Sequence, residues 1–95
     1  MREEGKAVLC RALAECASEE DVALFLDDLC TFQEVEQMAQ RALAAKLLLQ
    51  GRTYADIIAE TDISSATLSR VSRAIRHGSG RYKKFVGAEN EQNVK

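Results

Sequence analysis

The sequence contains no proline and few aromatic residues, since two tyrosines and three phenylalanines make up only 5% of it. Aromatic residues are enriched in strands and proline interrupts helices, so both features favour a helical chain over a β-sandwich. No run of 18 apolar residues is present, so no transmembrane segment is expected. The first four residues carry two acids where a secretory signal would be basic, which favours a cytoplasmic protein.

Cysteine and histidine are also scarce. Cys10, Cys16 and Cys30 form an odd set without Cys-x-x-Cys spacing, and His77 is the single histidine. We expect reduced core thiols rather than disulfides, and no metal site, because a zinc site needs more ligands at a regular spacing. No catalytic constellation is present, so an enzyme and a bound cofactor are not expected. His77 fits an interaction with the dipole at the end of a helix.

Charge is distributed unevenly along the 95 residues. Residues 1–50 carry 5 basic and 10 acidic side chains, whereas residues 51–88 carry 7 basic and 3 acidic ones. No acid occurs between Ser64 and Lys84. Despite an overall net charge of −2, the second half therefore has the local field that suits a nucleic-acid partner.

Capping signals divide the chain into helices. Ser18, Thr31, Thr53 and Ser64 fit N-cap positions, the first three with an acid three residues later. Gly51 and Gly78 fit left-handed residues that end helices. Together with the apolar periodicity, these signals predict helices at about 3–16, 19–30, 32–50, 54–60 and 65–77, and a short helical turn at 81–86. We expect one all-α domain over residues 1–87 and a frayed tail at 88–95.

The predicted third helix is apolar nearly all round. Seven of the eight residues from Ala42 to Leu49 are apolar, with Lys46 as the exception. Such a helix must be covered on nearly every side. A small subunit can hardly do so alone, so we expect a helix shared with a second copy in a homodimer. The alternative is a central core helix within a monomer.

Residues 53–70 have the pattern of a helix-turn-helix, which we place at about 54–77. Six apolar residues fit the inward face: Ile57, Ile58, Ile63, Leu68, Val71 and Ile75. Five other residues are expected to face solvent or a ligand: Ser65, Ala66, Ser69, Ser72 and Arg73. Asp62 stands where the turn usually has glycine, but aspartate tolerates the left-handed conformation comparatively well. Ile58 is larger than the usual alanine and predicts a wider helix crossing. A helical hairpin without a DNA role is the alternative.

Small polar residues and cations in this segment predict the contacts with double-stranded DNA. In a helix-turn-helix the second helix lies in the major groove, where small residues allow a close approach to base edges. Serine hydroxyls, N-terminal amides and basic side chains suit phosphates. The predicted DNA-binding residues are Ser64, Ser65, Ala66, Thr67, Ser69, Arg70, Arg73, Arg76, Lys83 and Lys84.

Five strings within residues 27–86 resemble the Trp repressor superfamily, most closely its YerC/YecD-like branch. They are Asp-Leu-Cys-Thr at 28–31, Gln-Arg at 40–41, Ala-Lys-Leu-Leu-Leu-Gln-Gly at 45–51, Thr-Tyr at 53–54 and Ser-Ala-Thr-Leu-Ser-Arg-Val at 65–71. The resemblance implies an intertwined, all-α homodimer with paired helix-turn-helix heads. It also implies a bacterial transcription regulator, most simply a repressor, that acts on a pseudo-palindromic site.

The resemblance also implies an effector pocket, because the Trp repressor binds tryptophan beside its recognition helix. Thr31, Arg41, Thr67 and Arg70 match positions of that pocket. Val71 stands where the repressor has glycine and would crowd the ligand, and Ala74 replaces a serine that helps to hold it. We therefore do not expect tryptophan as a co-repressor. The function expected is sequence-specific DNA binding; the alternative is a protein-interaction module that uses the same helical dimer.

Overall fold

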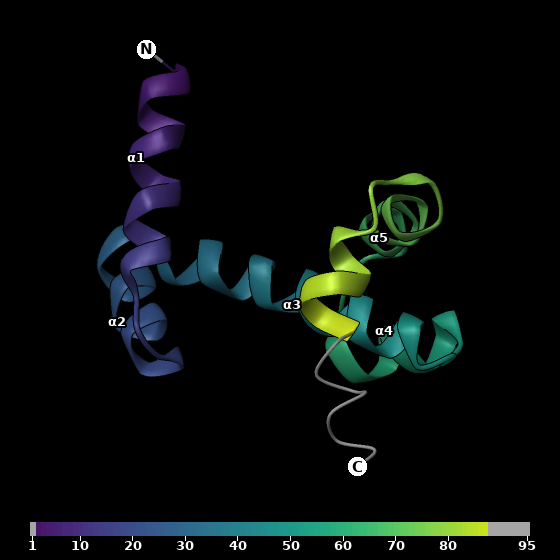
Figure 1. Cartoon of the computed structure of the whole chain (residues 1–95). Coiled ribbons are helices and arrows are strands. Elements are labelled where there is room, and N and C mark those ends of the chain that lie inside the picture. The colour runs from purple at the N-terminus through teal and green to yellow at the C-terminus, as the bar shows by residue number, and fades with distance from the viewer. Residues whose placement is uncertain (1, 88–95) are drawn as a thin grey trace. The chain divides into compact units, whose positions relative to one another are not determined.

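The computed structural model describes residues 2–87, and the predicted tail at 88–95 lies outside this range. The described residues form helices without a strand, which confirms the all-α class (Figure 1). In chain order these are α1 (Arg2–Glu15), α2 (Glu19–Leu29), α3 (Phe32–Leu49), α4 (Tyr54–Thr61), α5 (Ser65–His77) and η1 (Lys83–Gly87). The first five begin and end within one residue of their predicted bounds. The short last helix differs in kind, because residues 83–87 form a π-helix.

All four predicted N-caps are formed. Ser18, Thr53 and Ser64 each accept, through the side-chain oxygen, a hydrogen bond of 3.1 Å from the backbone amide three residues later. At the start of α3 the bonds are reciprocal: Glu34 N donates to Thr31 Oγ1 at 3.1 Å, and Thr31 N donates to Glu34 Oε1 at 2.8 Å. These bonds satisfy amides that have no acceptor within their own helix.

The two glycines predicted to end helices behave differently. Gly51 is left-handed, with φ of 88°, as predicted. Gly78 is extended, with φ of −89° and ψ of −164°, so the prediction of a left-handed residue there was wrong. Its amide donates to the carbonyl of Ala74 at 2.9 Å, and a Cβ at position 78 would collide with that same carbonyl. The position favours glycine through close approach rather than through φ.

The chain divides into two compact units between Val35 and Glu36. We call residues 2–35 the N-terminal unit and residues 36–87 the C-terminal unit. In the N-terminal unit no side chain whose exposure is described is fully buried. The apolar residues at helical spacing in α2, which are Val22, Phe25, Leu26 and Leu29, are half-buried or exposed. The prediction of core thiols was wrong for the same reason, since Cys10 is exposed and the other two cysteines are only half-buried. The single domain expected over residues 1–87 stays a prediction.

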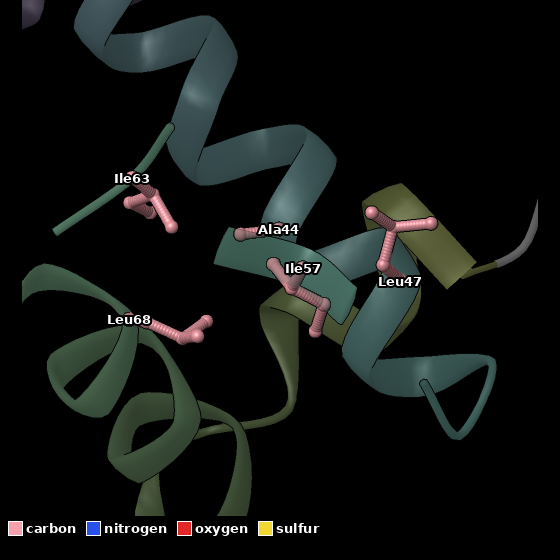
Figure 2. Close-up of a cluster of buried hydrophobic side chains, with 5 residues drawn as sticks. All are labelled: Ala44, Leu47, Ile57, Ile63 and Leu68. Carbon is pink, nitrogen blue, oxygen red and sulfur yellow. The ribbon is translucent and has the colours of Figure 1, made fainter. Parts of the chain in front are cut away.

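The C-terminal unit has a core of its own, built at the C-terminal half of α3. Side chains from α3, α4, the turn and α5 meet in one cluster (Figure 2): Ala44, Leu47, Ile57, Ile63 and Leu68. Leu48 and Ile58 pack against it from the side. Gly87 in η1 lies close to the side chain of Leu49, the last residue of α3. The core therefore fixes the helix-turn-helix on α3.

This core covers only part of the apolar surface of α3. Ala44, Ala45 and Leu47 are buried, whereas Ala42 is exposed and Leu43 keeps 42% of its surface accessible. The described chain therefore does not surround the apolar helix, although its sequence requires cover on nearly every side. Within residues 2–87, no helix combines the length and apolar character needed to cross a membrane.

Candidate nucleic-acid interface

The helix-turn-helix consists of α4, a three-residue turn and α5. Ile57, Ile63 and Leu68 are fully or almost fully buried between these elements. Ile63, which the sequence places on the inward face, is the apolar plug of the turn. Asp62 adopts the left-handed conformation, with φ of 61° and ψ of 17°, and its amide donates to the carbonyl of Ile58 at 2.9 Å. The turn thus forms with aspartate in the place of glycine, as predicted.

Side-chain hydrogen bonds fix the turn further. Thr61 Oγ1 donates to the carbonyl of Ile57 at 2.7 Å and accepts from the amide of Ile63 at 3.2 Å. The carbonyl of Thr61 accepts from Gln40 Nε2 of α3 at 3.1 Å. These hydrogen bonds of Thr61 and Gln40 were not predicted from the sequence. Gln40 had a usable signal, since it lies one helical turn before Ala44 on the same face of α3.

Most of the predicted outer face of α5 is exposed. Ser65, Ala66, Ser69 and Arg73 are exposed, and Val71 is buried with Leu68 on the opposite face. Ser72 was predicted to face outward, but it is only 7% exposed, so that prediction was wrong. The reason is the width of the buried stripe: a position four residues after a core residue lies on the same face as the position three residues after it.

The first turn of α5 is arranged to receive an anion. Ser64 Oγ accepts from the amide of Thr67 and donates to Thr67 Oγ1 at 2.9 Å, so both hydroxyls of this pair are engaged within the protein. The amides of Ser65 and Ala66 belong to the same first turn, where backbone donors lack acceptors within the helix. No acid occurs in this turn. Its partial positive charge is therefore available to a phosphate.

Cations follow along the same segment. Arg70, Arg73 and Arg76 are exposed on α5, and no carboxylate in residues 2–87 pairs with them. Lys83 and Lys84 are exposed in η1, with Lys84 Nζ 5.3 Å from the centre of the Phe85 ring. Guanidinium and ammonium groups of this kind can neutralise phosphates, because no carboxylate of the described residues competes for them.

Arg52, which lies just before α4, differs from these cations because it is paired with acids. Arg52 donates to Glu60 Oε1 at 2.8 Å and lies 3.8 Å from Asp56 Oδ2. Its charge is balanced by the acids of the bracing helix α4. The positive side of the helix-turn-helix is consequently α5 together with η1, as the acid-free segment of the sequence predicts.

A polar cavity of about 420 Å³ lies between α3 and the start of α5. Its lining consists of Gln37, Gln40, Arg41, Asp62, Ser64, Thr67 and Arg70. Three of the four predicted effector residues are thereby brought together; Thr31 does not line this cavity and caps α3 instead. Val71 is buried and Ala74 is exposed, and neither lines the cavity, so the predicted crowding by Val71 does not arise there. All of these lining residues carry a polar or charged group. No cluster of three metal-ligating side chains occurs in the described range.

Comparison with known proteins identifies the fold. The family model of the Trp repressor protein matches residues 4–90. The uncharacterized protein YerC of Bacillus subtilis (strain 168) is 44% identical over 63 residues, which are 66% of this chain. The match spans only 61% of the length of YerC.

Two solved structures share the architecture. A TrpR-like protein from Eubacterium eligens ATCC 27750 superposes with a TM-score of 0.85 at 31% identity, over 92% of this chain and 90% of its own. A candidate Trp repressor from Staphylococcus aureus gives a TM-score of 0.85 at 36% identity, over 92% of this chain and 87% of its own. With the family match extending over most of its length, the chain belongs to the Trp repressor family of DNA-binding regulators, where it is similar to the YerC-like branch.

Proposed function

We propose that this protein is a homodimeric, sequence-specific transcription regulator, most simply a repressor, whose helix α5 enters the major groove. The observation that carries the proposal is the outer face of α5, where small exposed side chains are followed by arginines that no carboxylate of residues 2–87 pairs with. A helix with this surface can approach base edges closely while its cations bind the flanking phosphates. Membership of a family of DNA-binding regulators supports the same function.

The proposed contacts fall into two groups. Ser65, Ala66 and Ser69 lie on the exposed side of the first turns of α5 and would face bases or the nearest phosphates. Ser64, which caps α5, and Thr67, to which it is hydrogen-bonded, would act through the N-terminus of this helix. The flanking phosphates would be bound by Arg70, Arg73, Arg76, Lys83 and Lys84. Tryptophan is not part of the proposal, because Thr31, one of the four residues that match the effector pocket, does not line the cavity beside α5.

The homodimer is proposed from apolar surface that the single chain leaves open. Leu43 of α3, Leu24 of α2 and Phe32 at the start of α3 keep 42%, 59% and 77% of their surface accessible. A second copy would remove these side chains from water and would complete the cover of α3. Residues 1–87 would then act as one domain within the dimer.

DNA binding is tested by selecting duplexes from a random library and titrating the best one at several salt concentrations. We expect affinity to fall steeply with salt, because each phosphate contact releases counterions. Arg73→Ala should lower affinity about three- to tenfold and reduce the salt slope by about one. Ser65→Asp should nearly abolish binding through repulsion between the carboxylate and the phosphates.

Arg11→Ala is the matched control, because Arg11 is an exposed arginine of α1 outside the proposed interface. This variant should bind like the wild type, and added tryptophan should leave every affinity unchanged. Protein that is fully folded but shows no salt-sensitive affinity for any duplex would refute the proposed function. Recovery of a protein partner after nuclease treatment would then favour an interaction module.

The dimer is tested by sedimentation equilibrium at micromolar concentration. We expect about twice the chain mass of 10.5 kDa. Leu43→Glu should shift the equilibrium towards the monomer, because it places a charge on the open apolar face of α3. Gln33→Glu adds the same charge to an exposed polar position of the same helix and should leave the mass unchanged. A wild-type chain that sediments as a monomer would contradict the dimer.

A further inference from the structure

Gln40 joins α3 to the turn of the helix-turn-helix. It is half-buried, and it lies on the same face of α3 as Ala44 and Leu47, four and seven residues later. Those two side chains enter the apolar core beneath α4 and α5. Gln40 continues this face by one helical turn, and there its Nε2 donates to the carbonyl of Thr61 at 3.1 Å. The contact bridges 21 residues of sequence.

The acceptor is the last carbonyl of α4. Carbonyls at the C-terminal end of a helix have no partner within it, so a donor from outside is required or water must supply one. Within the turn, the Thr61 hydroxyl holds the amide of Ile63 and the carbonyl of Ile57, and the Asp62 amide closes onto Ile58. Gln40 is thus the donor from α3 that ties this hydrogen-bonded turn to the helix on which it is mounted.

The apolar core and this hydrogen bond constrain the helix-turn-helix in different ways. Burial of apolar surface holds the elements together but has little directional preference. A hydrogen bond weakens steeply as its angle and length depart from their optimum. Helix α5 has 13 residues and is therefore roughly 20 Å long, so a tilt of about 10° about the turn moves its far end by about 3 Å. Such a movement is enough to break contacts with bases or phosphates.

We propose that Gln40 is a positioning residue, whose hydrogen bond to Thr61 sets the angle between α3 and the recognition helix α5. The proposal rests on the proposed function, since in a dimer that angle fixes the separation of the two recognition helices. A symmetric operator requires that separation to match one turn of DNA, about 34 Å. Gln40 thereby controls which half-site spacing is bound, without a contact to DNA.

The test replaces Gln40 by methionine, which keeps the length and the unbranched shape of the side chain but removes the donor. Gln37→Met is the matched control. Gln37 is an exposed glutamine of α3 that lines the same cavity, and the described structure gives it no hydrogen bond. Both variants are titrated with the best duplex from the library selection. They are also titrated with versions of it that carry one base pair more or less between the half-sites.

We expect Gln40→Met to lower affinity for the best spacing about fivefold, the scale of one lost hydrogen bond. Affinity for the two altered spacings should fall by less than about twofold, because a less constrained helix-turn-helix adapts to them. Gln37→Met should behave like the wild type on all three duplexes. An equal loss at every spacing, or no loss at all, would overturn the proposal, since a merely structural role predicts one common factor.

Amide hydrogen exchange of the free protein separates this inference from the proposed function. In Gln40→Met the amides of Asp62 and Ile63 should exchange at least about fivefold faster, whereas that of Leu68 should be unchanged. Unchanged exchange at the turn would refute the positioning role whether or not DNA is bound. Normal turn exchange in a wild type that binds no duplex would refute only the proposed function.

Discussion

The two units of this chain begin their helices with the same kinds of N-cap, but only the C-terminal unit has a buried core. The N-terminal unit begins α2 with Ser18 and α3 with a reciprocal capping box, and the C-terminal unit begins α4 and α5 with similar caps. Yet no described side chain of the N-terminal unit is fully buried, whereas five from the C-terminal unit form one buried cluster. Caps determine where helices begin; they do not provide a core.

The difference assigns the two units different sources of stability. The C-terminal unit packs α4 and α5 on α3 through its own buried cluster, although Leu43 of α3 stays accessible. The N-terminal unit leaves large apolar side chains such as Leu24 accessible. Under the proposed dimer, a second copy would cover them, and stability would then depend on protein concentration. Substitutions matched between the units test this division.

The largest effect is expected from truncating the cluster. Leu68 is fully buried, and Leu68→Ala should lower the free energy of unfolding by about 3 kcal/mol, because it removes transfer energy and leaves a cavity. Leu24→Ala makes the same chemical change at a residue that is 59% exposed, and should lower it by less than about 1 kcal/mol in the isolated chain. Urea denaturation followed by circular dichroism measures both.

Protein concentration extends this comparison. The effect of Leu68→Ala should persist unchanged over a hundredfold dilution, while that of Leu24→Ala should vary with dilution if a second copy covers the position. Equal losses for the two variants in a monomeric chain would show that the units do not differ in the way described.

A smaller effect is expected from removing the caps. Ser64→Ala should lower the free energy of unfolding by about 1 kcal/mol, because the amide of Thr67 loses its acceptor. Ser18→Ala removes an equivalent bond to the amide of Asp21. In the isolated chain the loss in α2 should appear as fraying, seen as reduced helicity with little change in the unfolding midpoint, because no buried cluster in its unit couples α2 to a cooperative transition. A full 1 kcal/mol shift from both variants would mean that α2 has cooperative tertiary support.

Local chemistry in the sequence was sufficient to predict the helices and the turn between α4 and α5. Caps depend on hydroxyl and carboxylate spacing over three residues, and the inward face of α5 depends on its apolar period. Both can therefore be recognised from the sequence. The left-handed Asp62 and the plug Ile63 were predicted on the same basis and are confirmed. The DNA contacts stay predictions.

Features that depend on tertiary contacts could not be predicted in this way. Whether Cys10 is a core thiol depends on whether its unit has a core, which its amphipathic helices do not reveal. Ser72 is buried because the buried face of α5 is wider than its apolar residues alone indicate. The bond from Gln40 to Thr61 requires knowledge of which face of α3 meets the turn. Each of these is decided by packing between segments distant in sequence.

The smallest effect is expected from Asp62→Gly at the end of α4. The same replacement by glycine at the end of α2 serves as its comparison in the other unit. Asp62 ends α4 at φ of 61°, where a side chain is strained, and Cys30 ends α2 at an extended φ of −115°. Asp62→Gly should therefore raise the free energy of unfolding by about 0.5 kcal/mol, because relief of strain exceeds the added entropy of the unfolded chain. Cys30→Gly should lower it by about 1 kcal/mol, because only the entropy and the loss of a half-buried side chain remain. Thermal unfolding of both variants under reducing conditions shows whether the free energy of unfolding rises in the first and falls in the second. A destabilising Asp62→Gly would indicate that the carboxylate, which lines the cavity with Arg41 and Arg70, contributes more than the strain of its backbone removes.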